Sequence, residues 1–437
     1  MARILPFRGL RYDESKVGKL RDVVTPPYDI ISPEQQQTYY EKNEYNVIRL
    51  EYGMEYDEDT VTENRYTRAA AFLSSWISEG VLRFEDEECL YLYEQRFVYK
   101  RQEFTYRGFI SRVQLEDFAN GVILPHEETL SKAKADRFNL MCTTSANFSQ
   151  IYCLYIDEEK QIDAVIKSIT KQEADVSFTD ENDIVQSLWI IRDKSVIDQV
   201  VGLFADKQLF IADGHHRYET ALAYRDKMRA EKPAYNQNDG FESVMMMLVD
   251  MDDPGLIVFP THRMVQGVKF DEVRVISALK DNFEINKIIV DQDAGELCSA
   301  MEQDLASLKD KNCFALYCGG DYYYRLYLSN PAVMEQFLPD CSDAYRRLDV
   351  SVLHTLVLEQ ILGIDSENLK SQKNLTYTRD ACEAVRSVQE GEQTCAFVLN
   401  PTKVHEIKDV SLAGEKMPQK STYFYPKLIT GLVMNKL

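Results

Sequence analysis

The segment from Leu209 to Tyr218 constrains the fold of this chain more than any other. Its apolar run ends abruptly at Asp213, and after the next four residues apolar side chains recur at helical spacing. This pattern predicts a strand, a tight turn and a helix start, the place where an α/β fold presents backbone N–H groups to an anion. Gly214 permits the turn, and Asp213 can cap the helix. We therefore predict an α/β fold with a phosphate or carboxylate site at this turn.

Two histidines and an arginine follow the glycine directly. His215 and His216 are adjacent, so on a helix they point about 100° apart and cannot form the i, i+4 metal pair of a zinc-binding helix. One can face the site while the other packs or caps; alternatively, both satisfy local hydrogen bonds. Arg217 offers a planar fork that suits phosphate or carboxylate, with a surface salt bridge to an acid such as Glu219 as the alternative.

Length and charge narrow the possible functions. With 437 residues the chain is too long for one ordinary domain. A change in the sequence pattern predicts a domain boundary near residue 268. The N-terminal core would span 1–268, and a C-terminal α/β domain over 269–437 would contribute to the cleft. The net charge of −21 argues against a nucleic-acid surface, but a local pocket for a small anion can still be basic.

The cysteines and the apolar runs predict where the protein works. Nine cysteines are scattered without a C-x-x-C pair, which favours reduced thiols in the cytoplasm over a disulfide framework or a zinc site. No run approaches the roughly 18 apolar residues that span a bilayer, and the first residues lack the apolar stretch of a secretory signal. We expect a cytoplasmic protein with no membrane partner.

Periodicity and turn residues predict the remaining elements. Ser32-Pro33 indicates a helix N-cap followed by proline at the first helical position. Alternating stretches at 89–98 and 104–113 predict an antiparallel hairpin, and 313–329 predicts a second one turning at 319–321. Further helices are expected at 62–80, 131–141, 158–171, 194–207, 271–281, 294–309 and 349–362, and further strands at 150–156, 243–249, 257–259 and 395–399.

Three other segments carry candidate ligands. His126, Glu127 and Glu128 place an imidazole beside two carboxylates in a predicted loop, where a carboxylate can act as a general base or bind Mg²⁺; a solvated loop is the stronger reading for this segment alone. Lys132, Lys134 and Arg137 can bind phosphate or form a solvated helix face. His262 and Arg263 are predicted at a strand end, as ligand contacts or as a capped end. Lys420, Ser421 and Thr422 offer a cation and hydroxyls, although the following aromatic residues can simply pack.

Seven segments in order resemble the bacterial and archaeal family of the domain of unknown function 1015. The resemblance covers nearly the whole chain. It rests on Pro6–Leu10, Pro26–Ile30, His126–Thr129, Ala212–Arg217, Pro260–Arg263, Leu348–His354 and Lys420–Lys427. The Walker A, dinucleotide-binding and nucleophile-elbow motifs are absent from the sequence, so standard P-loop, dinucleotide-fold and α/β-hydrolase readings lack support.

The central part also resembles, more remotely, the free serine kinases of the ParB/sulfiredoxin-like superfamily. Those enzymes show a His-Glu loop followed downstream by Asp-Gly-His-His-Arg, as at 126–127 and 213–217 here. The resemblance implies a ParB/sulfiredoxin-like core with additional N-terminal elements, to which this longer chain adds a C-terminal α/β domain. It also implies phosphorylation of the serine hydroxyl by a nucleotide or pyrophosphate.

Carried onto this sequence, the resemblance assigns roles to individual residues. Glu127 is the predicted base, with Glu128 as a substitute, and Asp213 orients Mg²⁺ or the acceptor. Gly214, His215, His216 and Arg217 hold the transferred phosphate. His262 with Arg263, or Lys132 with Arg137, serve the distal phosphates of the donor or the carboxylate of the amino acid.

The sequence therefore predicts a kinase for a small hydroxylated metabolite, with free L-serine as the leading acceptor. The donor is ATP, ADP or pyrophosphate with Mg²⁺, and self-association stays open. The alternatives are a phosphoserine phosphatase and a non-catalytic nucleotide-binding regulator. A sulfiredoxin-type reductase is disfavoured because residues 213–217 contain no cysteine.

Overall fold

The computed structural model describes residues 1–129, 131–290, 294–365, 368 and 373–437. Its contacts divide the chain into two compact units. Unit 1 comprises Met1–Pro125, Thr129–Leu256 and Pro426–Leu437, and unit 2 comprises His126–Glu128 and Ile257–Tyr425. Both units mix helices with sheets, which confirms the predicted α/β class. The boundary expected near residue 268 lies inside unit 2, beyond β14 (His262–Val265).

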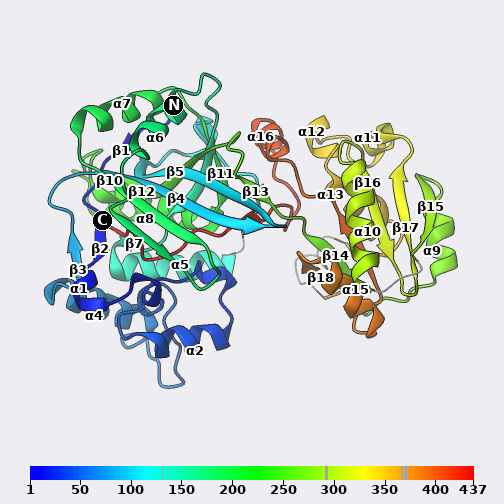
Figure 1. Ribbon diagram of the computed structural model, residues 1–437, viewed down its shortest axis with the longest axis horizontal. Coiled ribbons are helices and arrows are strands. Elements are labelled where there is room, and N and C mark those ends of the chain that lie inside the picture. Colours follow the sequence, from blue (N-terminus) through cyan, green and yellow to red (C-terminus); the bar gives the residue numbers. More distant parts are fainter. Residues whose placement is uncertain (130, 291–293, 366–367, 369–372) are drawn as a thin grey trace. The chain divides into compact units, whose positions relative to one another are not determined.

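A nine-stranded sheet forms the centre of unit 1 (Figure 1). Its order is β6-β11-β8-β12-β5-β4-β10-β9, with β1 paired to β5. The pairs β6–β11 and β8–β12 are parallel, and the others are antiparallel. The strands of the unit are β1 (Ile4–Leu5), β2 (Leu10–Tyr12), β3 (Leu82–Phe84), β4 (Leu90–Tyr99), β5 (Gln102–Gln114), β6 (Ile123–Leu124), β7 (Ala146–Asn147), β8 (Ile151–Tyr155), β9 (Val176–Thr179), β10 (Val185–Ile191), β11 (Leu209–Asp213), β12 (Ser243–Asp250) and β21 (Asn435–Lys436).

Helices cover one face of this sheet. Alternate strand residues such as Cys153 and Ile211 pack in one buried cluster with α6 (Gln161–Ile169), α7 (Lys194–Phe204) and α8 (His215–Glu231). Tyr106, from the opposite face, donates to the carbonyl of Pro426 at 3.3 Å, so the C-terminal segment is held against that face. The other helices of unit 1 are α1 (Glu14–Val17), α2 (Pro33–Lys42), α3 (Ile48–Glu51), α4 (Arg65–Ser78) and α5 (Ser131–Thr144).

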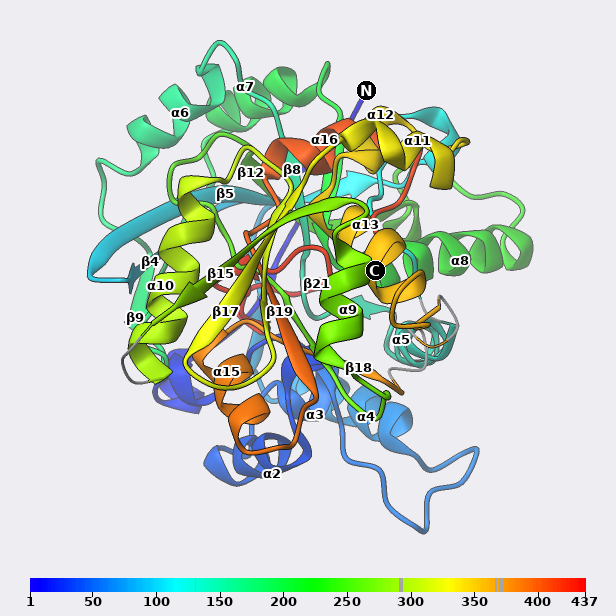
Figure 2. The same cartoon turned by 90° about the vertical axis from the view of Figure 1, so that its right-hand side faces the viewer.

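Unit 2 contains a six-stranded antiparallel sheet of order β15-β17-β16-β19-β14-β18 (Figure 2). Helices α10 (Ala294–Ser307) and α15 (Ala381–Gln389) pack against β16, β17 and β19. The remaining elements are β13 (Ile257–Val258), β15 (Phe283–Ile289), β16 (Cys313–Tyr317), β17 (Tyr322–Leu328), β18 (Leu375–Thr378), β19 (Cys395–Leu399), β20 (Phe424–Tyr425), α9 (Glu272–Leu279), α11 (Met334–Phe337), α12 (Asp343–Arg346), α13 (Asp349–Val352), the π-helical segment Leu353–Glu359 and α16 (Val404–Leu412).

The local patterns were informative about individual elements. Ser32 caps α2, as predicted, and the structure adds a reciprocal capping box with Gln35; the two predicted hairpins are β4–β5 and β16–β17. The predictions did not include β9, β10 or β15; six of the seven residues of β10 are buried, so its sequence does not show the alternation of a half-buried strand. Among the described residues, no helix is both long and apolar enough to cross a membrane.

Two expectations are corrected. Cys298 on α10 and Cys382 on α15 form a disulfide, with Cα atoms 5.3 Å apart, so the expectation of reduced thiols is wrong for this pair. Their neighbouring helices bring together cysteines that local spacing could not connect. The segment 260–263 was also expected at the end of a strand. β13 instead ends at Val258, and His262 and Arg263 begin the next strand, β14. Pro260, which has no N–H to donate to a sheet, lies between the two strands.

Candidate anion-binding site

The predicted strand–turn–helix is confirmed at the junction of β11 and α8. β11 ends at Asp213, and Gly214 adopts a φ of +94° before α8 begins at His215. A Cβ atom at Gly214 would lie 2.8 Å from the guanidinium of Arg217, so glycine is required by its φ and by the space that Arg217 occupies. β6 runs parallel to β11, so both strands end on the same side of the sheet, at their carboxyl ends.

Two cations hold the carboxylate of Asp213. Lys427 Nζ lies 2.8 Å from Oδ1, and an amino group of Arg217 lies 3.0 Å from Oδ2. The other amino group of Arg217 donates to the carbonyl of Gln150 at 2.6 Å. Burial alone would raise the pKa of Asp213, but the charges of Lys427 and Arg217 outweigh it and hold that pKa well below its usual range.

Asp213 consequently does not cap α8, which corrects one expectation. Gly214 occupies the N-cap position and has no side chain that could accept a hydrogen bond. The backbone N–H groups of the first turn are therefore not capped by Asp213, and the positive end of a 17-residue helix lies beside a lysine and an arginine. The backbone N–H groups at this helix start, with Lys427 and Arg217 beside them, can meet an anionic ligand despite the acidic composition of the chain.

The two histidines have different surroundings. His215 is buried, whereas His216 is half-buried near Asp29 and Glu219. Burial lowers the pKa of His216, and the two carboxylates oppose that shift without cancelling it. At neutral pH His216 is therefore an uncharged imidazole that can donate or accept a hydrogen bond.

Arg137 lies in a second layer of charges beside this junction. Its guanidinium contacts Asp136 at 2.5 Å and Glu51 at 3.4 Å and lies 3.9 Å from the ring centre of Tyr28. A cavity of about 30 Å³ separates it from Arg217. That space suits water and is too small for a phosphoryl group, so this placement favours a supporting role for Arg137.

The start of α5 is also fastened to α8. Glu219 accepts hydrogen bonds from Thr129 Oγ1 at 2.8 Å and from Lys134 Nζ at 2.7 Å. Glu219 thus pairs with Lys134, and the neighbouring acid with which Arg217 forms a salt bridge is Asp213. The side chain of Lys132 lies outside the described residues.

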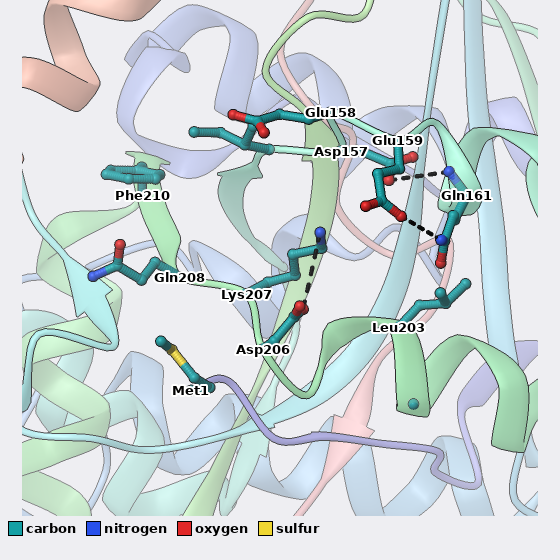
Figure 3. A pocket seen from close by; sticks show the side chains of 12 residues that line it. Met1, Asp157, Glu158, Glu159, Gln161, Leu203, Asp206, Lys207, Gln208 and Phe210 are labelled. Carbon is teal, nitrogen blue, oxygen red and sulfur yellow. Dashed lines mark hydrogen bonds and ion pairs between the residues drawn. The ribbon is translucent and has the colours of Figure 1, made fainter.

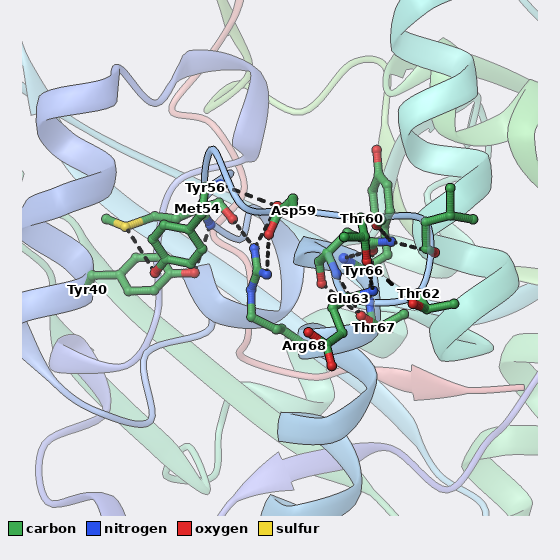
Figure 4. Close-up of polar contacts among 12 residues, drawn as sticks. Tyr40, Met54, Tyr56, Asp59, Thr60, Thr62, Glu63, Tyr66, Thr67 and Arg68 are labelled. Carbon is green, nitrogen blue, oxygen red and sulfur yellow. Dashed lines mark hydrogen bonds and ion pairs between the residues drawn. The ribbon is translucent and has the colours of Figure 1, made fainter.

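Helix α4 contributes a further set of polar contacts, among them those of Arg68 (Figure 4). Arg68 pairs with both oxygens of Asp59, at 2.5 and 2.9 Å, and donates to the carbonyl of Met54 at 2.7 Å, which holds the 54–63 loop. One turn earlier, Arg65 contacts Asp136 at 2.5 Å. The Asp136 that orients Arg137 is thus itself positioned by α4.

The family segments within unit 2 form a separate group. The N–H of Met417 donates to the carbonyl of His126 at 2.7 Å, and His126 Nε2 lies 3.0 Å from Thr422 Oγ1. Glu127 is half-buried and forms a backbone bridge with Met417, and Glu128 is exposed. The structure therefore joins His126 to Thr422, two candidates that the sequence places far apart.

The same segment reaches the second histidine–arginine pair. Arg263 is 1% exposed and donates to the carbonyls of Thr261 and Lys420, the latter at 3.1 Å. His262 is fully buried and accepts from the N–H of Leu399 at 3.2 Å. Burial lowers the pKa of His262 to about 4 and that of Arg263 to about 10. These positions favour a structural role for both residues over direct contact with a ligand.

Sequence reasoning missed several residues at the site of unit 1. Lys427, Asp29 and Tyr28 belong to segments noted only for their family resemblance, and Glu51 and Gln150 carried no motif signal. The available signal was the recurrence of those segments in one family. Their proximity to Asp213 could not be read from spacing, since Lys427 lies 214 positions away.

The described residues do not form a metal centre. No group of three or more histidine, cysteine or acidic side chains among them could hold an ion. Asp213 is already paired with two cations, so its surroundings do not fit a metal site built by the protein alone. Asp213 as a Mg²⁺ ligand remains a prediction, and we derive no step through the ion.

A larger cavity of unit 1 has the opposite character (Figure 3). It measures about 520 Å³ and lies where β8 ends and β11 begins, at the sheet edge opposite Asp213. Its lining includes Asp157, Glu158, Glu159 and Asp206, beside Lys207. This acidic cavity is unsuited to an anion, whereas the edge at Asp213 concentrates cations.

Comparison with known proteins identifies the family. The model of the protein family of unknown function DUF1015 matches residues 4–351, and the chain belongs to this family. No curated protein matches the chain. Three of the solved structures that match are a conserved hypothetical protein from Pyrococcus furiosus (15% identity, TM-score 0.31, 74% of this chain and 95% of that one), a free serine kinase in complex with AMP (14%, 0.32, 74% and 92%) and SbnI with a C-terminal truncation from Staphylococcus aureus (11%, 0.35, 74% and 85%).

Proposed function

We propose that this member of the DUF1015 family is a phosphotransferase that acts on the hydroxyl of a small metabolite, with free L-serine as the acceptor. The observation that carries the proposal is the carboxylate of Asp213 held between Lys427 and Arg217 at the start of α8. A phosphate or carboxylate group at this edge meets two cations and the N-terminus of a helix together.

The arrangement suits phosphoryl transfer. Such a reaction depends mainly on positioning and on neutralising charge at the transferred group, both of which fixed cations provide. The lowered pKa of Asp213 keeps its carboxylate ionised at neutral pH, so it holds Lys427 and Arg217 in place and can accept a hydrogen bond from an acceptor hydroxyl. His216, neutral at that pH, can donate to a phosphate oxygen.

Substrate identity rests on the resemblance of two motifs to those of free serine kinases. These motifs, at 126–127 and 213–217, support L-serine as acceptor and ATP, ADP or pyrophosphate with Mg²⁺ as donor. The proposed location is the cytoplasm. Glu127, the predicted base, belongs to unit 2 and is tested by its own substitution, Glu127→Gln, which should abolish turnover while sparing ligand binding.

The test is the formation of O-phosphoserine, followed by ³¹P NMR. The full chain is incubated with Mg²⁺, L-serine and each donor separately. Donor-dependent phosphoserine is expected, with a loss of about 100-fold or more in Asp213→Asn and in Lys427→Met, because each removes one charge of the proposed site. Lys160→Met is the matched control: Lys160 forms a 2.7 Å pair with Asp250 at the opposite edge of the same sheet, and its loss should leave turnover unchanged.

Other results would replace the proposal. Release of phosphate from phosphoserine without a donor would identify a phosphatase. Nucleotide binding without any turnover, in the parent and in Glu127→Gln alike, would identify a regulator. If no reaction and no binding occur, or if Lys160→Met loses as much turnover as Lys427→Met, the site at Asp213 is not the centre of the chemistry.

A further inference from the structure

A further cavity, of about 330 Å³, opens in unit 2, and none of its lining residues belongs to the site proposed above. It lies at the sheet edge where β16 begins and where β17 and β19 end, since Cys313 pairs with Tyr327 and Phe314 with Leu399. The loop before β16 and the first turns of α13 and α16 complete its walls. This volume falls within the range of small-molecule pockets, roughly 300–1,000 Å³.

Two half-buried carboxyl groups line this cavity. Asp349 accepts a hydrogen bond from the side-chain amide of Asn312 at 2.8 Å, and Glu406 is half-buried beside it. Burial, with a smaller contribution from the charge of Glu406, raises the pKa of Asp349 to about 7. Burial also raises the pKa of Glu406. The charge of Lys403 opposes both shifts without cancelling them, so burial is the dominant influence on the two carboxyl groups.

Exposed cations also line the cavity. They are Lys309, Lys311, Arg347 and Lys403. Two of them are paired, Lys403 with Asp310 at 2.9 Å and Arg347 with Asp343 at 3.9 Å. The lining thus places two half-buried carboxyl groups beside exposed cations, with Asp310 as an exposed carboxylate among them, and this arrangement can meet a molecule with an ammonium group at one end and an anionic group at the other.

We propose that this cavity is a binding site for a small zwitterion of the amino-acid or phosphoamine class. The ammonium group of the ligand lies against Asp349 and Glu406, and its carboxylate or phosphate lies among the exposed lysines. The wall of the cavity continues into a family segment, because Thr402 Oγ1 donates to the carbonyl of Ser421 at 2.7 Å. The site is independent of the phosphotransferase proposal and of Asp213.

The test is isothermal titration of the full chain with two matched pairs of probes. L-Aspartate is compared with succinate, and phosphoethanolamine with ethyl phosphate; each second compound lacks only the ammonium group. At least one zwitterion should bind about tenfold more tightly than its partner. Asp349→Asn should remove that preference, and Asp213→Asn should retain it.

A second variant keeps the test independent of the fold around Asp349. The double change Lys309→Gln with Lys311→Gln alters only exposed side chains and should weaken zwitterion binding about tenfold while the protein stays folded. Equal binding within both probe pairs would overturn the proposal, as would a failure of all four probes to bind. Binding lost in Asp213→Asn but kept in Asp349→Asn would place the ligand in unit 1 and overturn it as well.

Discussion

Arg217 and Arg263 both come from segments that resemble the family, yet their side chains differ in burial and in the partners that they bind. In unit 1, Arg217 is partly exposed and pairs with Asp213 beside Lys427. In unit 2, Arg263 is buried, and its guanidinium donates hydrogen bonds to main-chain carbonyls and to the imidazole of His354 at 3.4 Å. A paired, partly exposed arginine can meet a ligand, whereas one fully engaged by carbonyls fixes the course of a loop. An arginine in a family segment can thus either be available to a ligand, as Arg217 is, or hold a loop in place, as Arg263 does.

The sharpest test of this contrast is Arg263→Ala. We expect a loss of about 4 kcal/mol in the free energy of unfolding, because the change leaves buried carbonyls without donors and opens a cavity. Urea unfolding of the full chain measures it, with hydrogen exchange in β14 and β19 assigning the loss to unit 2. Arg379, exposed over the ring of Tyr423 at 4.0 Å, is the matched control, and Arg379→Ala should cost less than 1 kcal/mol. Equal losses of unfolding free energy in the two variants would show that burial of Arg263 contributes no more to stability than an exposed arginine does.

A somewhat smaller effect is expected from pH at His262. Its pKa is about 4 in the folded protein and about 6.5 when unfolded, so the unfolded chain binds more protons between these values. The free energy of unfolding should therefore fall by about 3 kcal/mol as pH decreases from about 6.5 to 4, because protonation removes the acceptor used by the N–H of Leu399.

Unfolding in urea at several pH values checks this, with His262→Gln expected to flatten the dependence. The pKa of His354 is also lowered by burial, so a residual slope should remain in that variant. An identical slope in the variant and the parent would show that His262 does not titrate in this window.

The smallest effect concerns the turn at Asp213. Gly214→Ala should destabilise the protein by about 1–2 kcal/mol, because its φ is unfavourable for alanine and the new Cβ meets the guanidinium of Arg217. Thermal unfolding measures this loss. Gly202, inside α7 with nothing within 4 Å of an added Cβ, is the control, and Gly202→Ala should stabilise the protein slightly. A neutral Gly214→Ala would contradict the packing described for Arg217.

Prediction from sequence succeeded where the determining interactions are local. The helix cap at Ser32, the β4–β5 hairpin and the turn at Gly214 each depend on residues a few positions apart. β10, at 185–191, was not predicted although it is buried within the sheet, because a short apolar run does not distinguish a strand from a helical segment. The family resemblance pointed to the segments that form the site, but it did not predict which side chains of those segments contact one another.

The sequence by itself determined the mixed α/β class, the family and the position of the candidate anion site at the start of α8. Tertiary structure decided that Lys427 supplies the second cation for Asp213, that Arg263 is buried and that Cys298 pairs with Cys382. The physical reason is the range of the interactions. Helix caps and turns are set by neighbouring residues, whereas burial and ion pairing between distant segments depend on how the sheets order their strands.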